Sequence, residues 1–318
     1  MDKQLKDKIV KAVNTFMAEH NLKPAEFART ADVNESYFNY VYRGKYTYQN
    51  TEVKDAFFRK IASAASFDIE PTYWSHVNTN QYDEIIYKLI EAHRYKYLNT
   101  IIGSTGSGKS YAVERYRKLH PLDTVVITVN NGDGVKSLLY ELAAALDLEL
   151  PHHPGFHLRA IARRLKKIYE EGRVLLIIID EAENTKTPCI KAYKAIYDLA
   201  VKLGYCGMAI VGTDEFLLNL DRYASHQSQQ GVVQFKRRIL AGITHLPAIN
   251  AKEEFAKFLD AAAIEDNGLR QLLQRQCSNY GVLHDYLERA IRIADEESEP
   301  LTEEFFRRVY NIPNVNLK

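Results

Sequence analysis

Largely apolar runs alternate with amphipathic segments through the middle of the chain. The runs lie at residues 97–102, 123–129, 174–179 and 206–213, and segments with helically spaced apolar residues separate them. The run at 174–179 is uninterrupted and bounded by Gly172 and a carboxylate pair, which is typical of a strand covered on both faces, as in a parallel sheet. The pattern therefore predicts an α/β domain with a parallel β-sheet core over residues 83–250.

Both ends of the chain show helical periodicity instead. Residues 1–65 and 251–318 carry apolar side chains at helical spacing, which predicts an N-terminal all-α domain and a C-terminal all-α lid. Residues 66–82 lose this periodicity and contain Pro71, which indicates an interdomain linker.

Composition narrows the range of functions without choosing among them. The 318 residues carry a net charge of +1, so any nucleic-acid-binding surface must be local. The three cysteines, Cys189, Cys206 and Cys277, form no C-x-x-C pair, which predicts neither a disulfide framework nor a zinc site. The N-terminal residues show no signal-peptide core and no window is apolar enough to span a membrane, so we expect a cytoplasmic protein.

Residues 103–110 match the phosphate-loop pattern G-x-x-x-x-G-K-[ST] without a mismatch. They follow a predicted strand and open a predicted helix, which is the context that this motif requires. Glycines let the backbone fold around an anion, and successive N–H groups then point at the phosphates. We expect Lys109 to reach the β- and γ-phosphates of ATP and the Ser110 hydroxyl to bind Mg²⁺. The predicted nucleotide-binding residues are Gly103, Ser104, Thr105, Gly106, Ser107, Gly108, Lys109 and Ser110.

Two acidic residues, Asp180 and Glu181, follow the apolar run at 174–179. A carboxylate at the end of a buried strand, beside a phosphate loop, suits Mg²⁺ coordination, and we assign this role to Asp180. Glu181 is better placed to polarise a water for attack on the γ-phosphate. Thr213 ends the next apolar run and is the predicted sensor of that water, with Asp214 as the alternative.

Arg237 and Arg238 form a pair shortly before the last predicted strand. The chain resembles an AAA+ ATPase in its phosphate loop, its acidic strand end at Asp180, its polar strand tip at Thr213, this arginine pair and its helical lid. The resemblance implies Mg²⁺-dependent ATP hydrolysis by an oligomer, because an arginine from one subunit completes the site of its neighbour. Arg238 is the candidate for this arginine in trans, and Arg237 is the alternative.

Residues 24–32 and 35–45 have the pattern of two short helices around a tight turn at Asp32–Asn34. Ala28, Val33 and the closing Arg-Gly-Lys resemble the lambda-repressor-like helix-turn-helix family, although that family often has glycine where this chain has Asp32. The resemblance implies that the second helix enters the DNA major groove. The alternative is a helical bundle used only for protein contacts. The DNA-contacting residues implied are Ser36, Tyr37, Asn39, Tyr40, Arg43 and Lys45.

The whole domain order resembles the MuB family, the ATP-dependent target-DNA activators of phage transposition, and more distantly the IstB-type helper ATPases. The segments that carry the resemblance are 102–117, 158–165, 178–182, 238–250 and 281–294. It implies an ATP-dependent homo-oligomeric filament on double-stranded DNA, largely indifferent to sequence, that presents this DNA to a transposase.

Lys136, Arg159 and Arg163 are the candidates for phosphate contacts along the bound DNA. The family's sensor arginine in the lid falls at His284 here, which makes His284 a candidate nucleotide contact. In addition, Thr213 stands where MuB has an asparagine, and His152–His153 replaces a basic run.

Two other functions fit the same motifs. A sequence-specific transcription regulator would use the ATPase as a switch and would require a defined operator. An AAA+ remodeller with a helical adaptor domain would bind no DNA in any nucleotide state.

Overall fold

The computed structural model describes residues 3–48, 51–67, 74–225 and 230–313. The chain divides near residue 72, inside the predicted linker, into two compact units, which are described separately below. Within the described ranges, no helix combines the length and apolar character needed to cross a bilayer.

The N-terminal unit packs its helices around one apolar core that includes Phe27, Phe38 and Phe58. Helices α2 and α3 lie where the sequence predicts the helix-turn-helix pair. The turn between them holds Asp32 at φ +50°, in the left-handed region that aspartate tolerates better than most residues. Asp32 therefore stands where the helix-turn-helix family often has glycine. Its carboxylate lies 2.8 Å from the Lys60 ammonium. The helices are α1 (Lys3–Glu19), α2 (Pro24–Thr30), α3 (Glu35–Tyr42) and α4 (Asp55–Ala64).

A short antiparallel pair departs from the predicted all-α character of this unit. Strands β1 (Thr47–Tyr48) and β2 (Thr51–Glu52) pair with each other. Strands of this length carry no alternation that could be recognised in the sequence.

The second unit contains a sheet whose paired strands are all parallel, in the order β4-β5-β6-β3-β7. Its strands lie where the apolar runs predict them. Their bounds are β3 (Leu98–Ile102), β4 (Thr124–Thr128), β5 (Leu175–Asp180), β6 (Cys206–Gly212) and β7 (Ile243–His245). Strand β6 lies between β3 and β5 and is parallel to both. The carboxyl ends of these three strands therefore meet at the same edge of the sheet.

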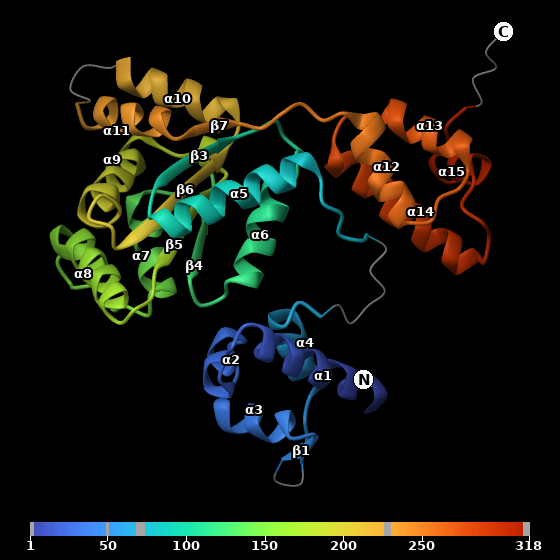
Figure 1. The fold of residues 1–318 in the computed structure, drawn as a ribbon, viewed down its shortest axis with the longest axis horizontal. Helices are drawn as coiled ribbons and strands as arrows, with labels where there is room; N and C mark the ends of the chain where they lie inside the picture. The colour runs from blue at the N-terminus through green and yellow to red at the C-terminus, as the bar shows by residue number, and fades with distance from the viewer. Residues whose placement is uncertain (1–2, 49–50, 68–73, 226–229, 314–318) are drawn as a thin grey trace. The chain divides into compact units, whose positions relative to one another are not determined.

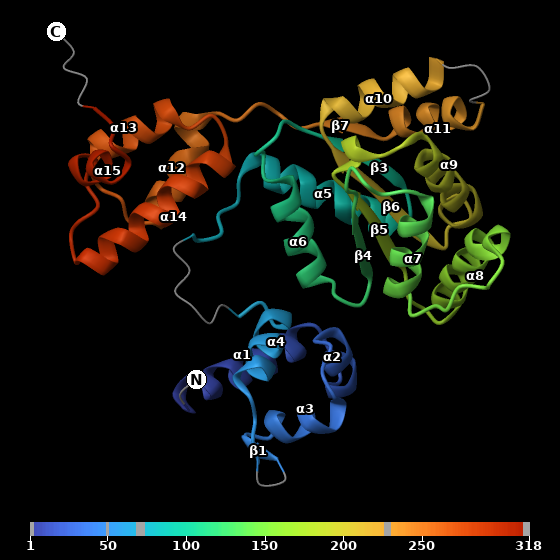
Figure 2. The ribbon, with the colours of Figure 1, turned by 180° about the vertical axis from the view of Figure 1, so that it is seen from behind.

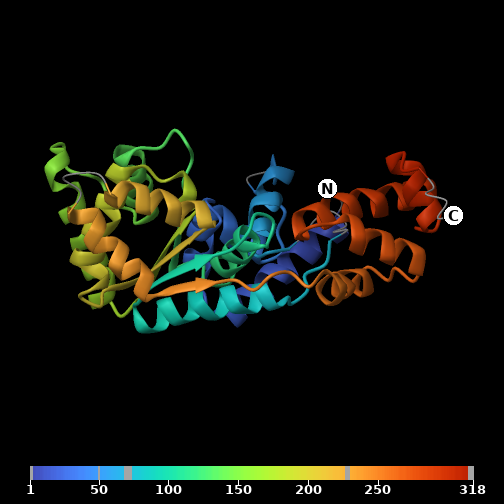
Figure 3. The same cartoon turned by 90° about the horizontal axis from the view of Figure 1, so that it is seen from above.

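Helices cover both faces of the sheet, as its continuous apolar strands require (Figures 1 and 2). In β5, Leu176 and Ile178 pack with helices α5 and α6, whereas Ile177 and Ile179 pack with helices of the opposite layer. Figure 3 shows α5 running along the sheet. The covering helices are α5 (Asn80–Tyr95), α6 (Lys109–Leu119), α7 (Val135–Ala145), α8 (His157–Glu170), α9 (Thr187–Ile196), α10 (Asp214–Ser225) and α11 (Gln230–Ala241). Shorter turns are η1 (Pro154–Phe156), η2 (Ala182–Asn184) and η3 (Tyr197–Val201), the last a π-helical continuation of α9.

The described structure of the α/β domain begins before residue 83, where the sequence predicts its start. Helix α5 starts at Asn80, because the Thr79 hydroxyl accepts the Tyr82 N–H at 3.1 Å and caps the helix. Trp74 and Val77, inside the predicted linker, pack against the apolar cluster of the lid. Residues 74–79 are therefore a docked part of the second unit.

The lid is helical, as predicted. Its core gathers Phe255, Leu273, Leu283 and Phe306. Its helices are α12 (Ala251–Ala261), α13 (Asn267–Gln276), α14 (Tyr280–Glu297) and α15 (Glu303–Tyr310). The predicted domain extends to residue 318, and residues 314–318 lie outside the described part of the chain.

Candidate nucleotide-binding and catalytic site

The phosphate loop joins β3 to α6, which begins at Lys109. Gly106 and Gly108 adopt φ +75° and +84°, a region that glycine enters without a steric penalty. The Lys109 ammonium donates to the carbonyl oxygens of Gly103 and Ser104 at 2.8 and 2.9 Å. The loop thus holds its lysine beside a helix N-terminus, where backbone N–H groups favour anions.

The loop also contacts the lid. The Tyr280 N–H donates to the Gly106 carbonyl at 3.1 Å. A Cβ atom at Gly106 would lie 2.3 Å from the Asn279 side-chain oxygen, so only glycine allows this close approach. The start of α14 is therefore packed directly on the phosphate loop.

Asp180 ends β5 and is only 4% exposed. Its carboxylate accepts a hydrogen bond from the Glu181 N–H at 2.9 Å. Burial raises the pKa of the Asp180 carboxyl, and the nearby Ser110 hydroxyl and Glu181 N–H oppose that rise. Both Ser110 and Asp180, the two predicted metal ligands, line the same cavity, and their oxygen atoms suit a hard cation such as Mg²⁺.

Glu181 leaves the strand at φ +53° and is exposed. One of its carboxylate oxygens accepts the Asn184 side-chain amide at 3.2 Å, and that amide also donates to the Val129 carbonyl at 2.9 Å. The left-handed turn thus separates the two acidic side chains, with Asp180 buried and Glu181 facing solvent.

Thr213 follows β6 and lies beside the phosphate loop, because Gly212 pairs with Ile102. The Thr213 N–H donates at 3.2 Å to Glu183, a carboxylate that is not among the predicted site residues. Burial lowers the pKa of the Lys109 ammonium, and the charge of Glu183 is the largest effect opposing this shift, followed by that of Asp180.

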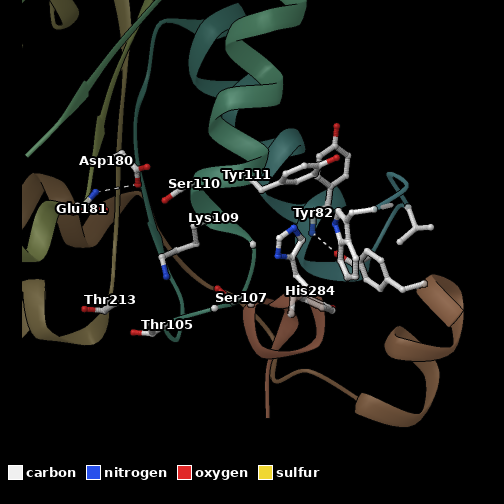
Figure 4. A pocket seen from close by; sticks show the side chains of 18 of the residues that line it. Tyr82, Thr105, Ser107, Lys109, Ser110, Tyr111, Asp180, Glu181, Thr213 and His284 are labelled. Atoms are coloured by element: carbon white, nitrogen blue, oxygen red, sulfur yellow. Dashed lines mark hydrogen bonds between the residues drawn. The ribbon is translucent and has the colours of Figure 1, made fainter. Parts of the chain in front are cut away.

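These side chains line one cavity of about 340 Å³ between the core and the lid. Figure 4 shows Lys109, Ser110, Asp180 and Thr213 gathered at one end, with Tyr82, Tyr111 and His284 at the other. The polar end therefore suits phosphates, and the aromatic end suits a flat apolar group. The full lining is Trp74, Val77, Thr79, Tyr82, residues 105–111, Asp180, Glu181, Glu183, Thr213, Phe258, Tyr280, Gly281 and His284.

Apart from His284, the residues of the aromatic end were not predicted as part of the site. Trp74 stacks on Phe258 with ring centroids 4.4 Å apart and meets the edge of His284 at 5.0 Å. His76 bonds the Tyr111 hydroxyl at 3.0 Å. The only sequence signal was the aromatic content of the predicted linker, because the partners of Trp74 lie in the lid.

His284, the candidate nucleotide contact of the lid, does line the cavity. Its Nδ1 atom lies 3.1 Å from the Asp285 carboxylate.

The phosphate loop also fits a phosphate group, since the Ser107 hydroxyl is buried and finds no hydrogen-bond partner among the residues described.

The paired arginines lie on α11 and differ in their surroundings. Arg238 is 2.7 Å from the Asp198 carboxylate and lies over the Tyr197 ring at 4.7 Å, both in the η3 segment. Arg237 is exposed, and across the described ranges no ion pair is found for it. Neither arginine is among the residues that line the cavity of its own chain.

The N-terminal DNA candidates do not form a uniformly exposed surface. Ser36, Arg43 and Lys45 are exposed, and the Lys45 ammonium lies 5.3 Å from the ring of exposed Tyr40. Asn39 is half-buried. Tyr37 packs edge-on against Phe57 at 5.0 Å, which makes it largely a packing residue.

The candidate DNA contacts in the α/β domain are all exposed. They are Lys136, Arg159 and Arg163. Lys136 lies in the first turn of α7, with its ammonium 5.6 Å from the Tyr140 ring. Arg159 and Arg163 lie one turn apart on α8 and line a surface groove. Leu199 and Leu203 line the same groove, so it is both basic and apolar.

Comparison with known proteins defines the class. Residues 92–220 match the family described as AAA domain. Cdc6p of Pyrobaculum aerophilum matches with a TM-score of 0.53 and 14% identity, covering 72% of this chain and 66% of that one. An ADPNP–ADP complex of the Aeropyrum pernix ORC2 protein gives a TM-score of 0.54 and 17% identity, covering 75% and 68%. The chain thus spans about two thirds of the length of these archaeal structures. The fold is that of an AAA+ P-loop ATPase with helical regions at both ends.

A curated relative narrows this class. The chain is 23% identical over 292 residues to the Mu-like prophage FluMu DNA transposition protein B of Haemophilus influenzae. The match covers 86% of this chain and 96% of the relative. The resemblance to MuB-type AAA+ proteins is confirmed.

Proposed function

We propose that this protein is an ATP-dependent DNA-binding ATPase that assembles as filaments on target DNA and delivers this DNA to a transposase. The observation that carries the proposal is the convergence of Lys109, Ser110, Asp180 and Thr213 on one cavity. Similarity along most of the chain to a protein named for DNA transposition supports the biological context.

In the proposed reaction, water attacks the γ-phosphorus of ATP and the bond to the bridging oxygen of ADP breaks. Lys109 binds the β- and γ-phosphate oxygens, and Ser110 and Asp180 would hold Mg²⁺. When bound, Mg²⁺ neutralises charge that develops on the phosphate oxygens. Glu181 takes the proton from the attacking water, and the Thr213 hydroxyl orients this water.

The aromatic end of the cavity would receive the base. Trp74, Tyr82 and Tyr111 line this end, and the flat face of a purine stacks favourably on such rings. In this arrangement residues 74–79, which lead out of the predicted linker, become part of the nucleotide site.

Trp74 provides a direct test, because it is the only tryptophan in the chain. Adding ATP is expected to change the intrinsic fluorescence, since the nucleotide alters the surroundings of the indole. Trp74→Ala is expected to weaken ATP binding by about tenfold, since stacking of a base on an aromatic ring contributes on the order of 1–3 kcal/mol. Because this variant lacks the indole, its affinity is measured with a labelled ATP analogue.

Trp74→Phe is the matched control. It keeps an aromatic face for the base, so it should bind the labelled analogue normally while showing no change in tryptophan fluorescence. Unchanged affinity in Trp74→Ala would exclude Trp74 from the base site.

We propose that an arginine of one subunit completes the site of the next. The ion pair between Arg238 and Asp198 within one chain favours Arg237 over Arg238 for this role, because Arg237 is exposed and need not break an existing pair. Arg238 would then orient the helix that presents Arg237.

DNA binding is proposed to use local basic surfaces, given a net charge of only +1. Arg43 and Lys45 in the N-terminal unit, and Lys136, Arg159 and Arg163 in the core, are surface cations suited to phosphate contacts. An Aeropyrum pernix ORC1 structure, described as a complex with DNA, resembles this chain with a TM-score of 0.51, 14% identity and coverage of 73% of this chain and 64% of that one. A protein of this fold is thus described with DNA, in keeping with the proposal.

Negative-stain microscopy with long duplex DNA tests the proposal. We expect helical filaments with ATP and none with ADP, and we expect affinity to fall steeply with salt, because phosphate contacts release counterions. Absence of any DNA binding with ATP would refute the proposal and favour a remodeller.

A sequence-specific regulator is the second candidate, favoured by the helix-turn-helix pair with exposed Ser36 and Arg43. Competition between unrelated duplexes separates the two functions. A regulator would discriminate its operator by roughly 10³-fold or more, whereas a filament-forming protein would bind all duplexes similarly.

A further inference from the structure

Glu183 occupies the point where the ends of β5 and β6 meet. The left-handed residue Glu181 directs the chain from β5 into the η2 turn, and Glu183 lies in this turn. Its carboxylate accepts the Thr213 N–H at 3.2 Å and lines the cavity. Glu183 thus connects the end of β5, where Asp180 and Glu181 lie, with Thr213 after β6, the predicted sensor of the attacking water.

The surrounding backbone is arranged for this contact. A Cβ atom at Gly212 would lie 2.8 Å from the Glu183 carboxylate, so a larger residue there would displace it. The Glu183 carbonyl accepts the Asn219 side-chain amide at 3.2 Å, which attaches the turn to α10. The Gly212 carbonyl in turn accepts the Gly103 N–H of the phosphate loop at 3.1 Å. One chain of contacts therefore runs from η2 through Gly212 and Thr213 to the phosphate loop.

We propose that Glu183 is a positioning residue for ATP hydrolysis, whose carboxylate holds Thr213 beside the phosphate loop so that its hydroxyl meets the attacking water. This inference rests on the proposed ATPase function. Glu183 acts through Thr213, because its bond is to the Thr213 N–H and not to a reacting atom. We expect its main effect on turnover rather than on nucleotide binding, since the hydrogen bonds of Lys109 to the Gly103 and Ser104 carbonyls do not involve Glu183.

Steady-state ATPase assays on Glu183→Ala, Glu183→Gln, Thr213→Ala and the Glu183→Ala/Thr213→Ala double variant test this role. Glu183→Ala is expected to lower kcat by about 10- to 100-fold, the range for losing a hydrogen bond to a charged group. Glu183→Gln should stay within about threefold of the wild type, because its amide oxygen can accept the same N–H. The double variant should lose no more than the slower single variant, since both changes remove one function.

ATP affinity, read from Trp74 fluorescence, and the melting temperature should both stay near the wild-type values in Glu183→Ala. Glu215→Ala is the matched control, since Glu215 is an exposed carboxylate close to Thr213 in sequence and outside the cavity. Full turnover in Glu183→Ala, a Gln variant as slow as the Ala variant, or losses that multiply in the double variant would each overturn the inference. A wild-type chain that hydrolyses no ATP would instead refute the proposed function.

Discussion

Replacing Lys109 with alanine is expected to weaken ATP binding by about 10- to 100-fold or more and to abolish DNA filaments with it. The ammonium is the buried cation of the phosphate loop, and hydrogen bonds between charged groups contribute on the order of 1.5–3 kcal/mol each. Binding is measured by fluorescence titration, and filaments are scored by microscopy with ATP.

Lys118→Ala is the matched control, because Lys118 lies on the same helix α6 but outside the cavity. It should bind ATP normally. Intact filaments in the Lys109→Ala variant would show that the loop does not control assembly. Normal ATP affinity would remove the phosphate-binding role altogether.

Glu181→Gln is expected to slow hydrolysis by about 10²- to 10⁴-fold, the usual contribution of a general base, while ATP binding persists. The amide cannot accept a proton from the attacking water but keeps the shape of the side chain. Since Glu181 is exposed and Asp180 is buried, the substitution should spare the predicted metal ligands. Single-turnover hydrolysis and ATP titration measure the two effects separately.

DNA filaments of Glu181→Gln should last longer in ATP, because the nucleotide is consumed slowly. Glu215→Gln, an exposed carboxylate at the start of α10, is the control and should hydrolyse ATP normally. If Glu181→Gln loses ATP binding as well, the residue holds the nucleotide and our assignment of the base is wrong.

Local sequence patterns predicted the strands and most helices correctly, since each depends on residues that are neighbours in the chain. Prediction failed where long-range packing decides. Residues 74–79 resembled a linker because the lid residue that Trp74 stacks on, Phe258, is far away in sequence.

In the candidate site too, residues within one local motif could be predicted from the sequence, whereas residues that depend on long-range contacts could not. Gly103–Ser110 and Asp180–Glu181 could be proposed from the sequence because each lies within a single turn or strand end. The exposed face of α3 could be inferred in part, but the Tyr37 ring packs against Phe57. Arg238 could not be separated from Arg237, since its partner Asp198 belongs to another helix.

The sequence by itself thus determined the class of chemistry, a phosphate loop followed by an acidic strand end, and the order of the domains. Only the tertiary structure decided how these parts meet. The strand order places Thr213 between the phosphate loop and Asp180, and the η2 turn brings Glu183 to Thr213. The lid closes the cavity through contacts such as that of Tyr280 with Gln81, 199 positions apart in the chain. Contacts over such separations depend on how whole elements pack, and no local pattern of residues records them.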